Sequence, residues 1–173
     1  QAGLLAMSAF AKSEVWGPGA EAWLDSLVAN RIPKKIGRIG LAHLLPKSGG
    51  VRSEFTIYRE APQRFYLVSA GAYERHDFDT LQKLLPTDGT VMLQKVTTQY
   101  GVLVLAGPES RAILQALTDT DLSTAAFPWL TGQTIHVGHA TAKPLRVNFV
   151  GELVWELHDP LQSHTHTLRL PPA

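Results

Sequence analysis

Apolar residues alternate or recur at helical spacing along the first part of the chain. Residues 10–16 alternate and run into Gly17-Pro18, and proline suits the first turn of a helix. We therefore predict a strand over 10–16 and a helix over 18–28. The following segment, 29–37, carries proline, asparagine, glycine and two lysines, which is typical of a loop.

Three further strands are expected between residues 38 and 69. The extended segments are 38–45, 51–58 and 64–69, with turn residues between them. The simplest arrangement is a three-stranded antiparallel meander. Alternation along the middle strand places Glu54 on its more polar face.

The rest of the chain repeats this mixture of helix and strand. Turn residues fill 118–132, and 160–173 is a proline-containing tail with weak periodicity. One predicted helix covers 72–85, and a second is opened by Gly107-Pro108-Glu109-Ser110 and reaches Leu117. The predicted strands are 91–100, 102–106, 133–137, 143–150 and 152–158.

An internal repeat links the two halves. Gly17-Pro18 is followed by alanine and leucines at the same spacing as Gly107-Pro108, and each pair stands between a strand and a helix. The two halves look like one duplicated β-α-β-β module, although strand, Gly-Pro and helix is also a common combination. In either case the fold class is α+β, with helices packed on largely antiparallel sheets.

Length and charge narrow the functional classes. The chain has 173 residues, 45% of them hydrophobic and 18% charged, which favours a folded globular unit over a disordered one. Its formal net charge of +1 provides no overall field that would attract nucleic acid or an anionic membrane. We expect neither as a partner.

Several kinds of chemistry are excluded. The chain contains no cysteine, which removes thiolate catalysis, disulfides and cysteine-ligated metals. It has no glycine-rich dinucleotide or phosphate-loop motif and no apolar run long enough to span a bilayer. We expect no targeting segment at its start and a cytoplasmic location by default.

Two groups of side chains are candidate binding sites. His158, His164 and His166 lie close together, but with no carboxylate between the last two they are better explained as solvated histidines than as a metal site, and we predict no metal. The basic run from Arg31 to Arg38 could bind a carboxylate or phosphate, although such runs are usually solvated loops.

Two glutamates stand in less ordinary settings. Glu54 follows a glycine-rich turn by one short strand segment, and Glu152 directly follows Gly151 between two predicted strands. Glycine tolerates a bulged backbone that can direct the next side chain toward a cavity. The alternative is that both are ordinary exposed hairpin residues.

An ordered series of short motifs resembles the folate-binding aminomethyltransferase domain, which occurs as the glycine cleavage T-protein and in the C-terminal part of dimethylglycine and sarcosine dehydrogenases. The latter group looks closer, and the resemblance runs from about Leu4 to Pro160. The motifs include Gly17-Pro18-Gly19-Ala20, Gly49-Gly50-Val51, Phe65-Tyr66-Leu67-Val68, Glu74-Arg75-His76-Asp77, Phe127-Pro128-Trp129-Leu130 and Val150-Gly151-Glu152-Leu153.

The resemblance implies a tetrahydrofolate site that takes up a one-carbon unit derived from a methylamine. Glu152 matches the glutamate that holds the pterin, and it is expected to face an enclosed hollow. One carboxylate can accept two N–H bonds from such a ring. Glu54 matches the catalytic acid, which is often aspartate in the family, and Phe149 and Ser69 are further expected folate contacts.

The resemblance also sets the expected domain limits and partners. Residues 1–160 are predicted to be the folate-binding domain, incomplete on its C-terminal side, with 161–173 as a tail of unclear order. FAD would come only through a missing domain or a flavoprotein partner. The alternative is a noncatalytic subunit or a homo-oligomerising interaction module that keeps the fold without folate chemistry.

Overall fold

The computed structural model describes residues 1–148 and 151–163. The chain divides into two compact units. The first unit consists of residues 9–97, and the second consists of residues 1–8 together with the chain from residue 98 onward.

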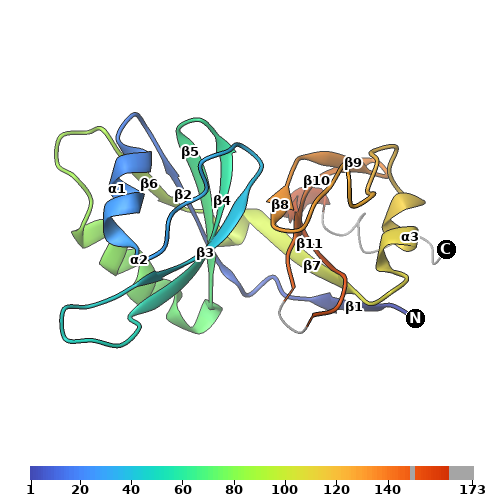
Figure 1. Ribbon diagram of the computed structural model, residues 1–173, viewed down its shortest axis with the longest axis horizontal. Helices are drawn as coiled ribbons and strands as arrows, with labels where there is room; N and C mark the ends of the chain where they lie inside the picture. Colours follow the sequence, from blue (N-terminus) through green and yellow to red (C-terminus); the bar gives the residue numbers. More distant parts are fainter. Residues whose placement is uncertain (149–150, 164–173) are drawn as a thin grey trace. The chain divides into compact units, whose positions relative to one another are not determined.

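The first unit is a five-stranded antiparallel sheet with the strand order β3-β4-β5-β2-β6. Two α-helices, α1 and α2, lie against one of its faces (Figure 1). Its elements are β2 (Ala11–Trp16), α1 (Ala20–Leu27), β3 (Ile39–Leu44), β4 (Ser53–Ala61), β5 (Arg64–Ser69), the 3-10 turn η1 (Gly71–Tyr73), α2 (Glu74–Lys83) and β6 (Met92–Lys95).

The core of the first unit lies between the helices and this sheet face. Phe55 and Ile57 of β4 belong to the same buried cluster as Trp23 and Leu24 of α1 and Leu81 of α2. Alternation along β4 sends these two residues to the covered face and Glu54 to the other face. Burial of the helices thus fixes which side chains the opposite face presents.

The second unit is also an antiparallel sheet with one helix. Its strand order is β1-β7-β11-β10-β8, and β9 also pairs with β10. Trp155 and Phe127 meet edge to face in its core, with ring centroids 5.1 Å apart. Its elements are β1 (Gly3–Ala6), the 3-10 turn η2 (Thr97–Gln99) at its boundary, β7 (Tyr100–Ala106), α3 (Ser110–Gln115), β8 (Thr131–Gly132), β9 (Ile135–Val137), β10 (Ala140–Arg146) and β11 (Val154–Pro160).

The two sheets share one topology. The order β3-β4-β5-β2-β6 of the first unit matches the order β8-β10-β11-β7-β1 of the second. Where the first unit has β3, the second has two short strands, β9 and β8, which both pair with β10. The edge strand β6 follows its module in sequence, whereas β1 precedes its module. The sequence repeat is therefore present as a structural repeat.

The paired glycines explain why the repeat is visible in the sequence. Gly17 has φ +119° and Gly107 has φ +115°, values that side-chain-bearing residues rarely adopt. A Cβ would lie 2.4 Å from the Thr90 carbonyl oxygen at Gly17 and 2.7 Å from the Gln1 carbonyl oxygen at Gly107. Both turns therefore need glycine for the same two reasons.

Most expected elements of regular structure are present, with differences at the edges. β1 was not expected, because its four residues carry no alternation of apolar and polar side chains. β8 lies in the predicted loop 118–132, and β6 ends at Lys95, before the predicted limit of 100. Within the described residues, no helix has the length and apolar character needed to cross a membrane.

Candidate functional site

Glu54 lies on β4, directly opposite His43 of the edge strand β3. The His43 Nε2 and Glu54 Oε2 atoms are 2.8 Å apart. The side chain of Glu54 is 58% exposed and that of His43 is 27% exposed. The predicted acid therefore lies on the sheet face opposite the helices, within reach of a ligand and anchored at one oxygen.

The same sheet face carries a buried lysine and a buried tyrosine. Lys12 of β2 donates from Nζ to the Phe10 carbonyl oxygen at 2.9 Å, and burial lowers its pKa while the charge of Glu74 opposes the shift. Burial also raises the pKa of Tyr58 to about 12, with a smaller contribution from Glu60. Tyr58 therefore stays neutral at physiological pH.

Ser69 ends β5, where it pairs in register with Ala11. It alternates in phase with Phe65 and Leu67, which pack in the core under the helices. Strand alternation thus assigns Ser69 and Glu54 to opposite faces of the sheet. The role of Ser69 as a folate contact stays a prediction.

Glu152 belongs to the second unit and lies in the segment that leads into β11. Gly151 before it has φ +84°, so this turn uses the left-handed conformation that glycine allows. Glu152 is exposed, and the structure shows no hydrogen bond between its carboxylate and another described residue. Both oxygens can therefore accept hydrogen bonds. Phe149 lies outside the described residues.

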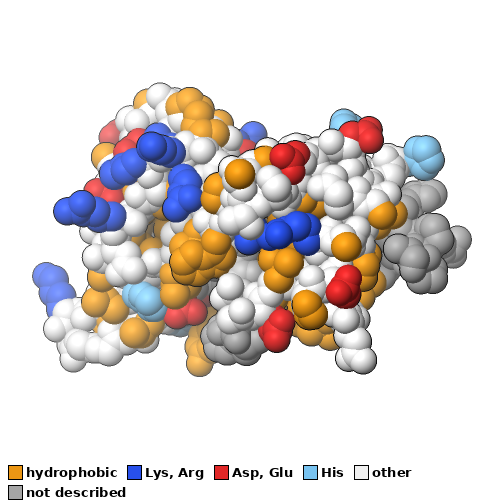
Figure 2. Space-filling model, turned by 45° about the vertical axis from the view of Figure 1, so that its right-hand side comes forward, with side chains coloured by type: hydrophobic (Ala, Val, Ile, Leu, Met, Phe, Trp, Pro, Cys, Tyr) orange, Lys and Arg blue, Asp and Glu red, His pale blue; other side chains and the backbone are white. Residues whose placement is uncertain are grey.

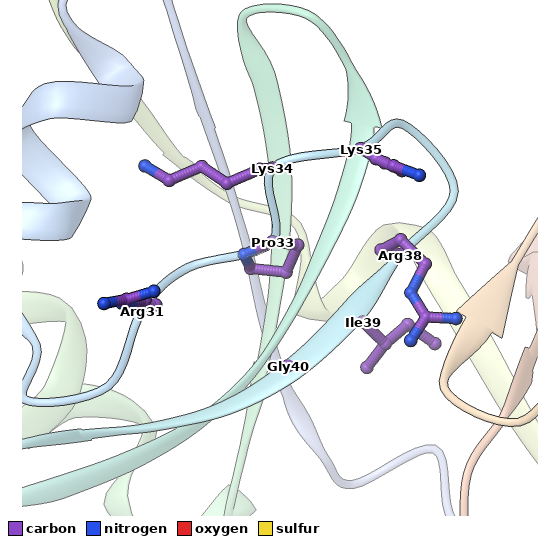
Figure 3. Close-up of a pocket in the computed structure, with 7 residues that line it drawn as sticks. All are labelled: Arg31, Pro33, Lys34, Lys35, Arg38, Ile39 and Gly40. Atoms are coloured by element: carbon purple, nitrogen blue, oxygen red, sulfur yellow. The ribbon is translucent and has the colours of Figure 1, made fainter.

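A basic hollow of about 490 Å³ lies beside β3 in the first unit. Figure 3 shows that Lys34 and Lys35 point away from each other, with Arg38 on the side of Lys35. Lys34 also bonds to Glu21 at 3.2 Å and lies 3.6 Å from Asp25. The cations do not converge on one point, which favours a solvated basic loop over an anion-binding site.

A second hollow of about 510 Å³ is lined by residues of η2, β7 and the segment around Leu161. Glu152 lines neither this hollow nor the basic one. The enclosed site expected around Glu152 is therefore not seen in either hollow.

The histidines give no metal centre within the described ranges. His158 is fully buried, with Nε2 3.3 Å from Glu156 Oε2, while His164 and His166 lie outside the described residues. Among residues 1–148 and 151–163, no three His, Asp or Glu side chains gather in a geometry suited to a metal ion.

Sequence reasoning missed His43, and a signal for it was present. The turn at residues 46–50 joins two strands whose register sets Leu44 against Ser53 and His43 against Glu54. Counting outward from the middle of that turn brings the two side chains together. The strand assignment alone, without the register, could not do so.

The family model for the GCVT N-terminal domain matches residues 1–169. The chain is 34% identical over 157 residues to mitochondrial dimethylglycine dehydrogenase of Mus musculus, covering 90% of this chain and 18% of that protein. It is 29% identical over 163 residues to the mitochondrial pyruvate dehydrogenase phosphatase regulatory subunit of Mus musculus, covering 92% of this chain and 19% of that protein. The chain thus spans less than a fifth of the length of these relatives.

A solved structure shares the fold. The glycine cleavage system aminomethyltransferase T from Bartonella henselae superimposes with a TM-score of 0.79 at 23% identity, over 96% of this chain and 45% of that one. The family match and the shared fold agree with the resemblance expected from the motifs. This chain belongs to the GCVT N-terminal domain family.

Proposed function

We propose that the chain is a tetrahydrofolate-dependent one-carbon transfer domain that acts with a dehydrogenase for dimethylglycine or sarcosine. Its membership of the GCVT N-terminal domain family supports this, as does the likeness to a dimethylglycine dehydrogenase. The observation that carries the proposal is the exposed Glu54 carboxylate anchored by His43, and the motif resemblance assigns to this residue the place of the family's acid.

The residues fit a folate in their chemistry. Glu152 has two carboxylate oxygens to offer, which suits the exocyclic amino group and ring N–H of a pterin, and a charged pair of hydrogen bonds of this kind is strong. We assign pterin binding to Glu152, with Ser69 and Phe149 as additional contacts.

Glu54 is assigned the proton-carrying role. Condensation of formaldehyde with tetrahydrofolate replaces two N–H bonds by two N–C bonds of a methylene bridge and releases one water. Protons must therefore leave nitrogen and reach oxygen. A carboxylate with one anchored oxygen and one open oxygen can accept and return such a proton, and help of this kind typically accelerates reactions ~10² to 10⁴-fold.

Oxidation of the methylamine belongs to another part of the system. The sequence carries no dinucleotide-binding motif, and the chain matches 18% of the length of the mouse dimethylglycine dehydrogenase. We propose that a flavin, if one is used, is held by a further domain or partner chain.

The proposal predicts catalysed formation of 5,10-methylenetetrahydrofolate. With tetrahydrofolate and formaldehyde, the chain should raise the rate above that of the spontaneous reaction. Glu54→Gln should lower the catalysed rate by at least ~100-fold, because the amide cannot accept the proton. The rate is followed by absorbance of the product, with the exposed Glu109→Gln as the matched control. Equal rates for Glu54→Gln and the unaltered chain would refute the role of Glu54.

A second function, a noncatalytic interaction module, is favoured by two observations. One relative of this chain is called a regulatory subunit. In addition, Leu4 and Leu5 of the edge strand β1 are 55% and 58% exposed. The space-filling view shows further apolar side chains, in orange, at the surface (Figure 2). Light scattering distinguishes this function, because a clean monomer at high concentration, together with folate binding, would count against it.

A further inference from the structure

We propose that His43 is the positioning residue of Glu54: it holds Oε2 of the carboxylate and leaves Oε1 as the oxygen that exchanges protons. This inference rests on the proposed function of Glu54. It adds to that function a residue that the sequence motifs do not mark.

The strand register fixes the pair. His43 and Glu54 are directly opposed in the β3–β4 ladder, between Leu44 with Ser53 on one side and Ala42 with Phe55 on the other. Ala42 and Phe55 are buried in the core, so neither strand can slip without exposing apolar side chains. The core thus holds the two functional side chains opposite each other.

The direction of the hydrogen bond follows from the chemistry of the two groups. An ionised carboxylate has no proton to give, so the His43 Nε2–H donates to Glu54 Oε2 at 2.8 Å. This donor is present in the Nε2–H tautomer of the neutral ring and in the protonated ring alike. Among the described residues, no partner is shown for Oε1, which stays open toward a ligand.

Other charged groups on this sheet face are engaged elsewhere. Arg64 binds Glu14 and also contacts Glu60 at 3.2 Å, and Lys12 donates to the Phe10 carbonyl oxygen. The other titratable groups that alternate onto this face are Tyr58 of β4 and Tyr66 of β5, both buried. Within the described part of the chain, the hydrogen bonds shown for Glu54 therefore come from His43.

Stability does not account for the pair. Exposed ion pairs contribute little to folding, and Glu54 is more than half exposed. The second unit provides a comparison, because His136 of β9 lies opposite Thr141 of β10 at the corresponding register position, with no carboxylate. The fold therefore accepts a histidine there without requiring an acid opposite it.

The test compares single and double variants in the formation of 5,10-methylenetetrahydrofolate from tetrahydrofolate and formaldehyde. His43→Ala should lower kcat by about 10-fold, the size expected for one hydrogen bond to a charged group, with KM for tetrahydrofolate unchanged. His43→Gln should recover part of the loss, since its amide can donate to Glu54. His136→Ala is the matched control and should leave both constants unchanged.

The double variant separates positioning from a general structural effect. In the Glu54→Gln background, His43→Ala should cause no further loss, because its effect passes through Glu54. A full additional 10-fold loss there would overturn the proposal, as would an unchanged kcat in the single variant.

A spectroscopic measurement tests the pair even if the chain proves to have no folate activity. In ¹⁵N-labelled chain without ligand, the His43 Nε2–H should exchange with water several-fold more slowly than in Glu54→Ala. Equal exchange rates would overturn the proposal. Absence of any folate-dependent rate, with slow exchange retained, would instead refute the proposed function and leave the pair established.

Discussion

At the residue scale, Arg59 holds the basic loop against the rest of the first unit. Its guanidinium is buried, donates to the Pro33 and Pro62 carbonyl oxygens at 3.2 and 2.6 Å, and binds Glu21 Oε2 at 2.6 Å. It also lies 5.1 Å from the centroid of the Phe65 ring. The loop that follows α1 is thus held against β4 by charge-assisted bonds, in addition to the burial of Ile32 in the core.

This arrangement predicts an acid-sensitive contribution to stability. Hydrogen bonds from Arg59 and then Lys34 lower the pKa of Glu21. A carboxylate whose pKa is lower in the folded state stabilises that state above its unfolded value, and the effect is lost as the pH falls through the folded value. The loss of stability should therefore begin as the pH falls below the ordinary glutamate pKa of about 4.3. It should stay within about 1 kcal/mol, because Glu21 is partly exposed.

Urea unfolding of Glu21→Gln at pH 7 and at pH 3 checks this expectation. The variant should be less stable than the unaltered chain at pH 7, and the difference should shrink at pH 3. Glu109→Gln, an exposed glutamate for which no ion pair is shown, serves as control. A Glu21→Gln difference that stays constant with pH would contradict the assigned role of this carboxylate.

At the element scale, the two glycine turns control the start of each repeat. Gly17→Ala and Gly107→Ala should each destabilise the chain by about 2 to 4 kcal/mol, since each combines a strained positive φ with a backbone collision. Thermal unfolding followed by circular dichroism measures the effect. Gly3→Ala is the control, with open space around its Cβ, and should change stability by less than about 0.5 kcal/mol. A neutral result at either turn would contradict the equivalence of the two repeats.

The elements differ in how well the sequence predicts them. Strand β5 was predicted with its exact limits, 64–69, because its apolar residues continue up to clear turn residues on both sides. β1 was missed because a four-residue edge strand, exposed throughout, owes its conformation to pairing with β7 and not to local pattern. Local spacing thus predicts core strands, and tertiary pairing decides the edges.

The candidate site follows the same division. Motif resemblance selected Glu54 and Glu152 as separate positions, and alternation gave the correct polar face for Glu54. The contact with His43 depends on the register between two strands, which residue types alone do not specify. The roles of Ser69 and Glu152 in folate binding stay predictions that ligand binding must test.

At the scale of the whole molecule, two units of one topology make up the described structure. The family assignment applies to nearly the whole chain, since the GCVT N-terminal domain model matches residues 1–169. The expected kinship with dimethylglycine dehydrogenases is confirmed at 34% identity. Folate binding is the property that would join this kinship to an activity.

Heat protection by tetrahydrofolate tests that property most directly. At a ligand concentration 100 times Kd, binding to the folded state adds about 2.7 kcal/mol, which should raise Tm by about 5 to 10 °C. Glu152→Gln should lose most of this shift, while Glu109→Gln should keep it. No shift in the unaltered chain, or an equal shift in Glu152→Gln, would contradict the account.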